Sequence, residues 1–466
     1  MLLSSSTYFI FLAGVLLLYW PISRLRFVTL AVILFANYFF YAKWSLYYLA
    51  LIPAASTCDY LIGLGLQSYK RPIARRLLVT ASVAMNLGVL ASFKYMPFFL
   101  GNWADVTGKP APEWNWTLPL SLSFYVFQAL TYTIDLYRSD IPGTRSYLAH
   151  LAAVSFFPTA IAGPITRVAS LVEQFEKPKR LSADDGGRAL FLIGMGLVKK
   201  FLIADFLGAN LVNRVFDFPN LYSGTETLLA VYAYSLQIYY DFSGYTDIAI
   251  GSALLLGIRL PRNFNRPYAA DSVADFWRRW HITLSNWLRD YLYFSLPGLR
   301  SKWKIFTYMN LIITMVLGGL WHGASWNFAI WGALHGIGLA VVRFWQVRTG
   351  TAKASGVWRY ANIFVTFHFI AFTWVFFRAA SFDNALAILS RIGSLSVSAV
   401  NVSGSFALIL AIGALAHYVP KKWYDFGQAF FIRSPFYAQA AALALLVVGL
   451  QFVGQTGATP FIYNKF

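Results

Sequence analysis

The chain contains 466 residues, of which 58% are hydrophobic, 18% are aromatic and only 12% are charged. This composition excludes a soluble globular protein and predicts a polytopic membrane protein built from α-helices. The net charge of +19 would suggest a nucleic-acid partner in a soluble protein. Here the lysines and arginines lie in short loops between apolar runs, so we expect topology signals and contacts with anionic lipid, and no nucleic acid.

The apolar runs continue along the whole chain without a polar block large enough to fold alone. We therefore expect a single integral membrane domain over residues 1–466, with a catalytic core at about 118–378 and C-terminal helices at about 403–453. About eleven or twelve helices should cross the membrane, with re-entrant and interfacial pieces between them. The single cysteine, Cys58, is interpreted as structural and leaves no disulfide framework.

The first third of the chain predicts five crossings, at residues 1–20, 27–42, 44–66, 77–100 and 118–137. Arg24 and Arg26 follow the first crossing, and a larger basic loop runs from Lys70 to Arg76. Basic loops face the cytoplasm, which places the N-terminus and the tryptophan-bearing loop 101–116 outside.

The apolar piece from Tyr147 to Ile165 contains Pro158, Gly163 and Pro164, which interrupt a helix. A re-entrant hairpin explains both this break and the charged segment that follows. Irregular backbone at membrane depth is tolerated only where it is buried in protein or lines a cavity. A plain kinked crossing explains the same sequence equally well.

Two further crossings are expected at residues 189–210 and 225–258. Lys199 and Lys200 of the first either snorkel or face the interior. The second carries Asp241 and Asp247, which are six residues apart and fall on different helix faces. We therefore expect separate polar partners that support a cavity, and no carboxylate pair that shares a proton.

The stretch DSVADFWRRWHITLSNWLRDYLYF, residues 271–294, predicts an amphipathic helix on the cytoplasmic surface. Ser272 and Asp275 form a capping box at its start. An interfacial anchor explains most of the stretch but leaves Asp290 unexplained, and we expect Asp290 to face the mouth of a tunnel. Candidate supporting or tunnel-lining residues in the same stretch are His281, Asn286 and Arg289.

A long apolar run from Phe306 to Trp345 carries His322 and His335 in its middle. An imidazole at bilayer depth is costly and indicates a working site, and His322 is the first candidate, with Trp321 and His335 beside it. Small residues in this run allow close approach of helices or leave room for a ligand: Gly318, Gly319, Gly323, Ala324, Gly332, Ala333 and Gly336. Two interhelical hydrogen-bond donors in a packed bundle are an equally good explanation of the two histidines.

A further crossing at residues 358–377 carries His368, another buried imidazole. Two last crossings, near 406–417 and 438–452, flank Lys421 and Lys422, which should be cytoplasmic. The sequence lacks a phosphate-binding glycine loop, a GxSxG elbow and a Cys/His cluster with metal-ligand spacing. We therefore expect no metal and no permanently bound cofactor.

Taken together, these segments resemble the membrane-bound O-acyltransferase (MBOAT) family, in the bacterial branch similar to alginate O-acetylation proteins and to the D-alanyl transferases of teichoic acid. The resemblance covers nearly the whole chain. The segments that carry it are NLGVLASFKYMPFF (86–99), LSFYVFQALTYTIDLYR (122–138), FPTAIAGPITR (157–167), YYDFSGYTDIAIG (239–251), and the ordered series RNFNRPY, DFWRRWHITLSNWLRDYLYF, GGLWHG and WGALHG between 262 and 336.

The resemblance implies a helical bundle around a central tunnel or funnel, and O-acyltransferase activity. In that family the histidine of the motif matching GGLWHG is catalytic, and an aspartate or asparagine lies some tens of residues upstream. His322 and Asp290 match these two positions. A further histidine in a segment like VTFHFIAFTWVFFRA is typical, which gives His368 a supporting part.

Acyl transfer from a thioester to a hydroxyl needs a base near neutral pH, and a buried neutral imidazole suits that role. We expect a cytoplasmic acyl-thioester donor such as acetyl-CoA and a multi-pass location in the bacterial inner membrane. The resemblance implies O-acetylation of an extracellular polysaccharide such as alginate or cellulose, with a periplasmic acetyltransferase partner. A transporter or flippase, or a non-catalytic scaffold of a polysaccharide-modification complex, remains the alternative, and both would tolerate the loss of His322.

Overall fold

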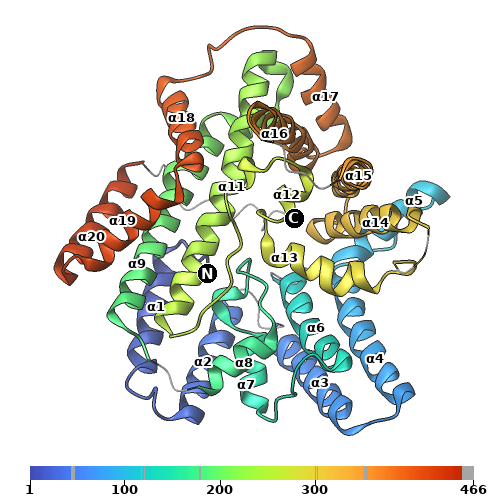
Figure 1. Cartoon of the computed structure of the whole chain (residues 1–466), viewed down its shortest axis with the longest axis vertical. Coiled ribbons are helices and arrows are strands. Elements are labelled where there is room, and N and C mark those ends of the chain that lie inside the picture. Colours follow the sequence, from blue (N-terminus) through green and yellow to red (C-terminus); the bar gives the residue numbers. More distant parts are fainter. Residues whose placement is uncertain are drawn as a thin grey trace. The chain divides into compact units, whose positions relative to one another are not determined.

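The computed structural model describes residues 1–43, 48–116, 118–119, 121–177, 180–299, 301, 303–350 and 355–453. The start of the predicted crossing at 44–66 lies outside this described part. Every regular element within it is a helix and none is a strand, which confirms the predicted all-α class (Figure 1). The chain forms two compact units, residues 1–190 with 248–261 and residues 191–247 with 262–466.

The first unit holds the N-terminal helices. These are α1 (Ser6–Tyr19), α2 (Arg26–Ala42), α3 (Tyr48–Ser68), α4 (Pro72–Leu90), α5 (Met96–Thr107), α6 (Leu122–Arg138), α7 (Tyr147–Val154) and α8 (Val168–Glu176). A π turn, η1 (Ala91–Tyr95), joins α4 to α5. Buried Asp59 of α3 accepts hydrogen bonds from Ser82 and Asn86 of α4, at 2.6 and 2.9 Å, so that this carboxylate ties two helices together.

The helix break predicted between Tyr147 and Ile165 is present. Helix α7 ends at Val154, a single 3-10 turn η2 (Phe157–Thr159) follows, and the chain stays buried through this stretch. A Cβ atom at Gly163 would lie 2.5 Å from the Cα atom of Thr159, so only glycine fits this fold of the backbone. The irregular segment is therefore enclosed by protein, as the re-entrant interpretation requires.

The second unit holds most of the remaining elements, and α9 (Ala183–Leu197) and α11 (Gly224–Leu255) run through both units. Its helices are α10 (Asn213–Asp217), α12 (Val273–Trp277), α13 (Ile282–Trp287), α14 (Ile305–His322), α15 (Trp326–Thr349), α16 (Val357–Arg378), α17 (Phe382–Gly393), α18 (Gly404–Tyr418), α19 (Lys421–Arg433) and α20 (Phe436–Val453). Short π and 3-10 segments complete it. The π segments are η3 (Val198–Asp205), η4 (Gly208–Val212) and η7 (Leu288–Leu292), and the 3-10 turns are η5 (Pro219–Leu221), η6 (Pro267–Ala269) and η8 (Tyr293–Ser295).

Five stretches of the described chain are long and apolar enough to cross a membrane, or up to six if the bent pair α18–α19 forms one crossing. These are 49–68, 72–107, 305–322, 326–349 and 357–378, and shorter apolar helices include α1, α2 and α20. Helix α11 is not among them because buried polar side chains interrupt its apolar sequence. The total of eleven or twelve crossings stays a prediction, which rests on counting these shorter and more polar helices as well.

The polar groups predicted for residues 189–258 pair with one another. The Lys199 ammonium lies 2.5 Å from Asp247, and the Lys200 ammonium lies 2.8 Å from both Asp205 and Asp241. Both lysines thus face the interior, and Asp241 and Asp247 have separate cationic partners, as their spacing predicted. Such pairing is what allows charged groups to remain in a buried helical bundle.

The prediction of one continuous amphipathic helix over residues 271–294 is wrong. Helix α12 ends after five residues, His281 adopts a left-handed conformation (φ 41°), and the chain continues as α13, η7 and η8. The break arises because Asn263 accepts hydrogen bonds at its backbone oxygen from the Ile282 amide, at 2.9 Å, and at its side chain from the Thr283 amide, at 3.2 Å. These amides would otherwise have bonded within a continuous helix.

The apolar stripe of this stretch is buried inside the protein and does not anchor it to lipid. All of its predicted members are at most 8% exposed: Val273, Phe276, Trp277, Trp280, Leu284, Trp287, Leu288 and Tyr291. The start of the stretch is as predicted, because the Ser272 hydroxyl accepts a hydrogen bond from the Asp275 amide and caps α12. The stretch is a core element of the second unit.

Candidate active site

His322 is presented by a tight helical hairpin of α14 and α15. A Cβ atom at Gly336 would lie 2.6 Å from the Cα atom of Ile312. Cβ atoms at Gly332 and Gly319 would collide with the backbone oxygens of Met315 and Phe328. The two helix backbones are therefore in contact at Gly319 of α14 and at Gly332 and Gly336 of α15, and the predicted close approach through small residues is confirmed.

His322 is the last residue of α14 and its side chain is only 4% exposed. The next residue, Gly323, is extended (φ −159°, ψ 143°) and turns the chain toward α15. The imidazole is enclosed by aromatic rings: its centroid lies 5.0 Å from Trp321, 5.2 Å from Trp331 and 5.3 Å from Phe377, each edge-on. Rings on several sides fix the plane of the imidazole.

Asp290 lies in the π turn η7, which packs on α14. The Asp290 carboxylate accepts a hydrogen bond from Nε of Arg289 at 2.8 Å, and their side chains are 21% and 56% exposed. The contact between η7 and α14 falls at Gly318, where a Cβ atom would lie 3.1 Å from the Leu288 side chain. The structure therefore brings the turn that carries Asp290 to the last turns of the helix that ends at His322.

His281 lies nearer to this site than its sequence position suggested. Its imidazole is fully buried, its Nδ1 atom lies 3.1 Å from Oδ1 of Asn263, and its ring centroid lies 6.3 Å from that of Trp321. Burial lowers the pKa of His281 to about 3, so this imidazole is neutral near pH 7. Asn263 was not among the predicted site residues, although it stands in the RNFNRPY segment that carries the resemblance.

His335 is buried and both of its ring nitrogens are hydrogen-bonded. Nδ1 lies 3.2 Å from the indole Nε1 of Trp277 on α12, and Nε2 lies 3.0 Å from the hydroxyl of Thr373 on α16. This matches the alternative explanation, in which the histidine serves as an interhelical hydrogen-bonding group.

His368 is half-buried on α16, and its nitrogens are also engaged. Nδ1 donates to the backbone oxygen of Phe364 at 2.8 Å, and Nε2 lies 2.9 Å from the hydroxyl of Tyr232 on α11.

The remaining candidates, Asn286 and Arg289, are exposed. Among the supporting candidates, Trp321, His281 and His335 are linked to His322 by ring contacts, directly or through one further ring. The predicted tunnel stays a prediction.

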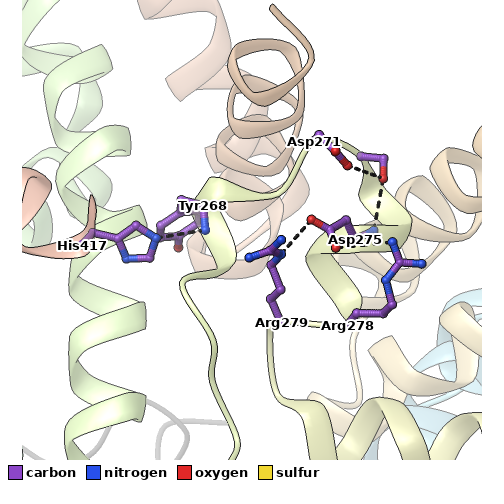
Figure 2. A network of polar contacts seen from close by, with 7 residues as sticks. Tyr268, Asp271, Asp275, Arg278, Arg279 and His417 are labelled. Carbon is purple, nitrogen blue, oxygen red and sulfur yellow. Dashed lines mark hydrogen bonds and ion pairs between the residues drawn. The ribbon is translucent and has the colours of Figure 1, made fainter. Parts of the chain in front are cut away.

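Polar contacts fix α12 and the segments on both sides of it (Figure 2). The Asp275 carboxylate accepts hydrogen bonds from Nε of Arg279 at 2.7 Å and from Arg278 at 3.3 Å. In the same view the Tyr268 amide donates to Nε2 of His417 at 3.1 Å, which joins α18 to η6. His417 was predicted only as the end of a crossing, because nothing near it in sequence indicates this distant partner.

Comparison with known proteins identifies the family. Residues 40–382 match the model described as MBOAT, membrane-bound O-acyltransferase family. This chain belongs to that family. A protein of Azotobacter vinelandii named probable alginate O-acetylase AlgI is 40% identical over 431 residues, which cover 90% of this chain and 84% of that protein.

More distant relatives carry related names. The peptidoglycan O-acetyltransferase of Helicobacter pylori is 36% identical over 79% of this chain and 74% of its own length. The teichoic acid D-alanyltransferase of Bacillus subtilis is 29% identical over 64% of this chain and 78% of its own length. As an MBOAT protein with several apolar helices, the chain is a membrane protein and an O-acyltransferase.

Proposed function

We propose that this MBOAT protein moves acetyl groups from a cytoplasmic thioester, acetyl-CoA, toward O-acetylation of an extracellular polysaccharide such as alginate or cellulose. The proposed location is the bacterial inner membrane. The names of the relatives support acyl transfer to cell-surface polymers as the common theme. The observation that carries the proposal is the buried imidazole of His322 at the end of α14, within the matching family motif.

His322 is proposed as the general base. A neutral imidazole nitrogen takes the proton of the acceptor hydroxyl while the hydroxyl oxygen attacks the thioester carbonyl carbon. The tetrahedral intermediate then collapses, the carbon–sulfur bond breaks, and the departing thiolate takes the proton back from the imidazolium. The products are an ester and a free thiol, and the imidazole is neutral again.

Asp290 is proposed to orient a substrate at the same site. Its carboxylate is only partly exposed, and the turn that holds it packs on α14 near Gly318, one helical turn before His322. The ion pair with Arg289 holds the carboxylate at the surface of this turn. An acceptor hydroxyl or the thioester could be positioned by such a group without proton transfer to it.

The donor is proposed to arrive from the cytoplasm because basic side chains concentrate in loops predicted to lie there. The loop 70–76, for example, carries Lys70, Arg71, Arg75 and Arg76 and no acidic residue. Coenzyme A carries phosphate groups that such a field attracts. No nucleic acid is proposed as a partner.

A periplasmic acetyltransferase is proposed to pass the acetyl group to the polymer. Every regular element of the described residues is a helix, and no stretch of the sequence indicates a sugar-binding module. An acetyl group that leaves the membrane domain would then need a protein that recognises the polysaccharide. Direct entry of polymer hydroxyl groups into the site is the competing possibility.

Reconstitution in vesicles tests these assignments. Labelled acetyl-CoA is supplied on one side of oriented proteoliposomes, with and without a periplasmic acetyltransferase and polymer on the other. We expect transfer only when the donor faces the basic loops, such as 70–76, and polymer labelling only when the partner is present. Labelling with donor on the side of loop 101–116 would overturn the orientation, and polymer labelling without the partner would overturn the relay.

A further inference from the structure

The hydrogen bonds of His335 fit the neutral imidazole with its proton on Nε2, and they leave neither ring nitrogen free to act as a base. The indole N–H of Trp277 can only donate, so the Nδ1 atom of His335 must be its acceptor. The Thr373 hydroxyl donates to the Ile370 backbone oxygen at 2.8 Å, so the Nε2–H of His335 donates to that hydroxyl. Both nitrogens are committed, and His335 links α15 to α12 and to α16.

The indole of Trp331 lies between His335 and His322. Its ring centroid is 4.7 Å from that of His335 and 5.2 Å from that of His322, and the second pair is nearly perpendicular at 86°. The same indole stacks on Trp374 of α16, with centroids 5.8 Å apart and planes 18° from parallel. Trp331 is 1% exposed, so it has little room for another rotamer.

We propose that His335 is a positioning residue that sets the orientation of His322 through Trp331. His335 packs against the Trp331 indole, and the indole in turn limits rotation of the His322 imidazole. This inference rests on the proposed role of His322 as the base. His335, the second histidine of the α14–α15 hairpin, then fixes the position of His322 and takes no part in proton transfer.

Loss of His335 should slow acyl transfer, because proton transfer depends on the position of the base. A general base must lie within hydrogen-bond reach of the proton that it takes, and a misplacement of about 1 Å can cost about 100-fold in rate. The variant His335→Ala leaves Trp331 without its neighbour on one side. The acyl-transfer kcat should therefore fall by about 10- to 100-fold, while the donor KM changes little.

A double-mutant cycle separates this role from an independent contribution. His335→Ala, Trp331→Ala and the double variant are compared in purified, reconstituted protein. If both residues act along one path, the double variant should lose no more than the worse single variant. Losses that multiply would overturn the proposal.

Conservative variants give a second readout. His335→Gln keeps one donor and one acceptor and should retain most of the wild-type kcat. Thr373→Ser keeps the hydroxyl group and should also retain most of the wild-type kcat. Thr373→Val keeps the shape of the side chain but removes the acceptor of the Nε2–H group, and should lower kcat several-fold. If His335→Ala fails to fold, this Thr373 pair decides, because equal kcat in Thr373→Val and Thr373→Ser would overturn the proposal.

The protonation state can be measured without any turnover. In protein labelled with ¹⁵N at histidine, His335 should show a protonated Nε2 and an unprotonated Nδ1, and the reverse tautomer or a doubly protonated ring would overturn the proposal. The variant His322→Ala tests the proposed function separately. Full activity in His322→Ala would remove the base assignment, whereas an inactive His322→Ala with multiplicative Trp331 and His335 losses would remove only this inference.

Discussion

Two neighbouring parts of the second unit are held together in different ways. The α14–α15 hairpin is joined backbone to backbone at Gly319, Gly332 and Gly336. The stretch from α12 to η8 is broken into short helical pieces, and Asn263 bonds two backbone amides that a continuous helix would have paired, one through its backbone oxygen and one through its side chain. The hairpin presents His322, and the broken stretch presents His281 and Asp290.

The contrast indicates why each part is suited to its task. Close-packed helices leave few alternative positions for a residue at their end, which favours a fixed base. A broken stretch can aim several polar side chains in directions that one helix face does not provide, since π and 3-10 turns change the side-chain register. The site thus combines a rigid helical hairpin, which presents His322, with an irregular segment, which presents His281 and Asp290.

The largest effect is expected at the end of the rigid hairpin. His322→Ala should abolish acyl transfer, with a loss of at least about 100-fold because a general base contributes that much or more. The protein should still fold and insert, since alanine is small and uncharged and suits the last turn of α14. Turnover of labelled acetyl-CoA, measured beside detergent size-exclusion profiles, checks this expectation.

His368→Ala is the matched control, because it deletes the same group from a half-buried position whose hydrogen bonds go to Tyr232 and Phe364. It should retain most of the activity. Equal losses in both variants would mean that the hairpin end has no special part in the reaction.

Much of the hairpin could be predicted from sequence because its determinants are local. Glycine spacing within one apolar run predicted the close contact, and the position of His322 among those glycines made it the first candidate. The interruption at Pro158 and Gly163 was predicted for the same reason.

The broken stretch could not be predicted in the same way. Its apolar spacing is that of one helix, but Asn263 lies eighteen residues before His281 and bonds to Thr283 from outside the stretch. The role of His335 depends likewise on Trp277 and Thr373, which are 58 and 38 residues away. Neither partner can be inferred from spacing, because tertiary contacts override the local pattern.

The rigidity of the hairpin can be tested by adding one methyl group. In Gly332→Ala the new Cβ atom would collide with the Met315 backbone oxygen, so the helices must separate. The free energy of unfolding should fall by about 1–3 kcal/mol, as in other overpacked interiors. Thermal unfolding in detergent measures the change. Gly427→Ala in α19 is the control, since its Cβ atom would meet nothing within 4 Å, and a comparable loss there would contradict the packing argument.

The broken stretch should respond to the loss of a side chain outside it. Asn263→Ala removes the acceptor used by His281 and Thr283, which leaves buried donors unsatisfied at a cost of about 1–3 kcal/mol. Thermal unfolding and protease resistance near residue 281 report the change. Asn286→Ala, an exposed position in the same stretch, should change stability by less than about 0.5 kcal/mol. If the two variants behave alike, Asn263 is not what holds the break.

The smallest effects are expected at the start of the broken stretch, where one carboxylate serves two arginines. Arg279 is 24% exposed and lies 2.7 Å from Asp275, whereas Arg278 is 67% exposed and lies 3.3 Å away. Partly exposed ion pairs contribute about 0.2–1 kcal/mol, and the value falls with exposure and salt. Arg279→Ala should therefore lower the unfolding temperature slightly, and Arg278→Ala should lower it less. The difference between them should shrink in high salt, because screening weakens the Arg279 pair. A larger loss for Arg278→Ala would show that this exposed arginine, and not Arg279, holds the Asp275 carboxylate in solution.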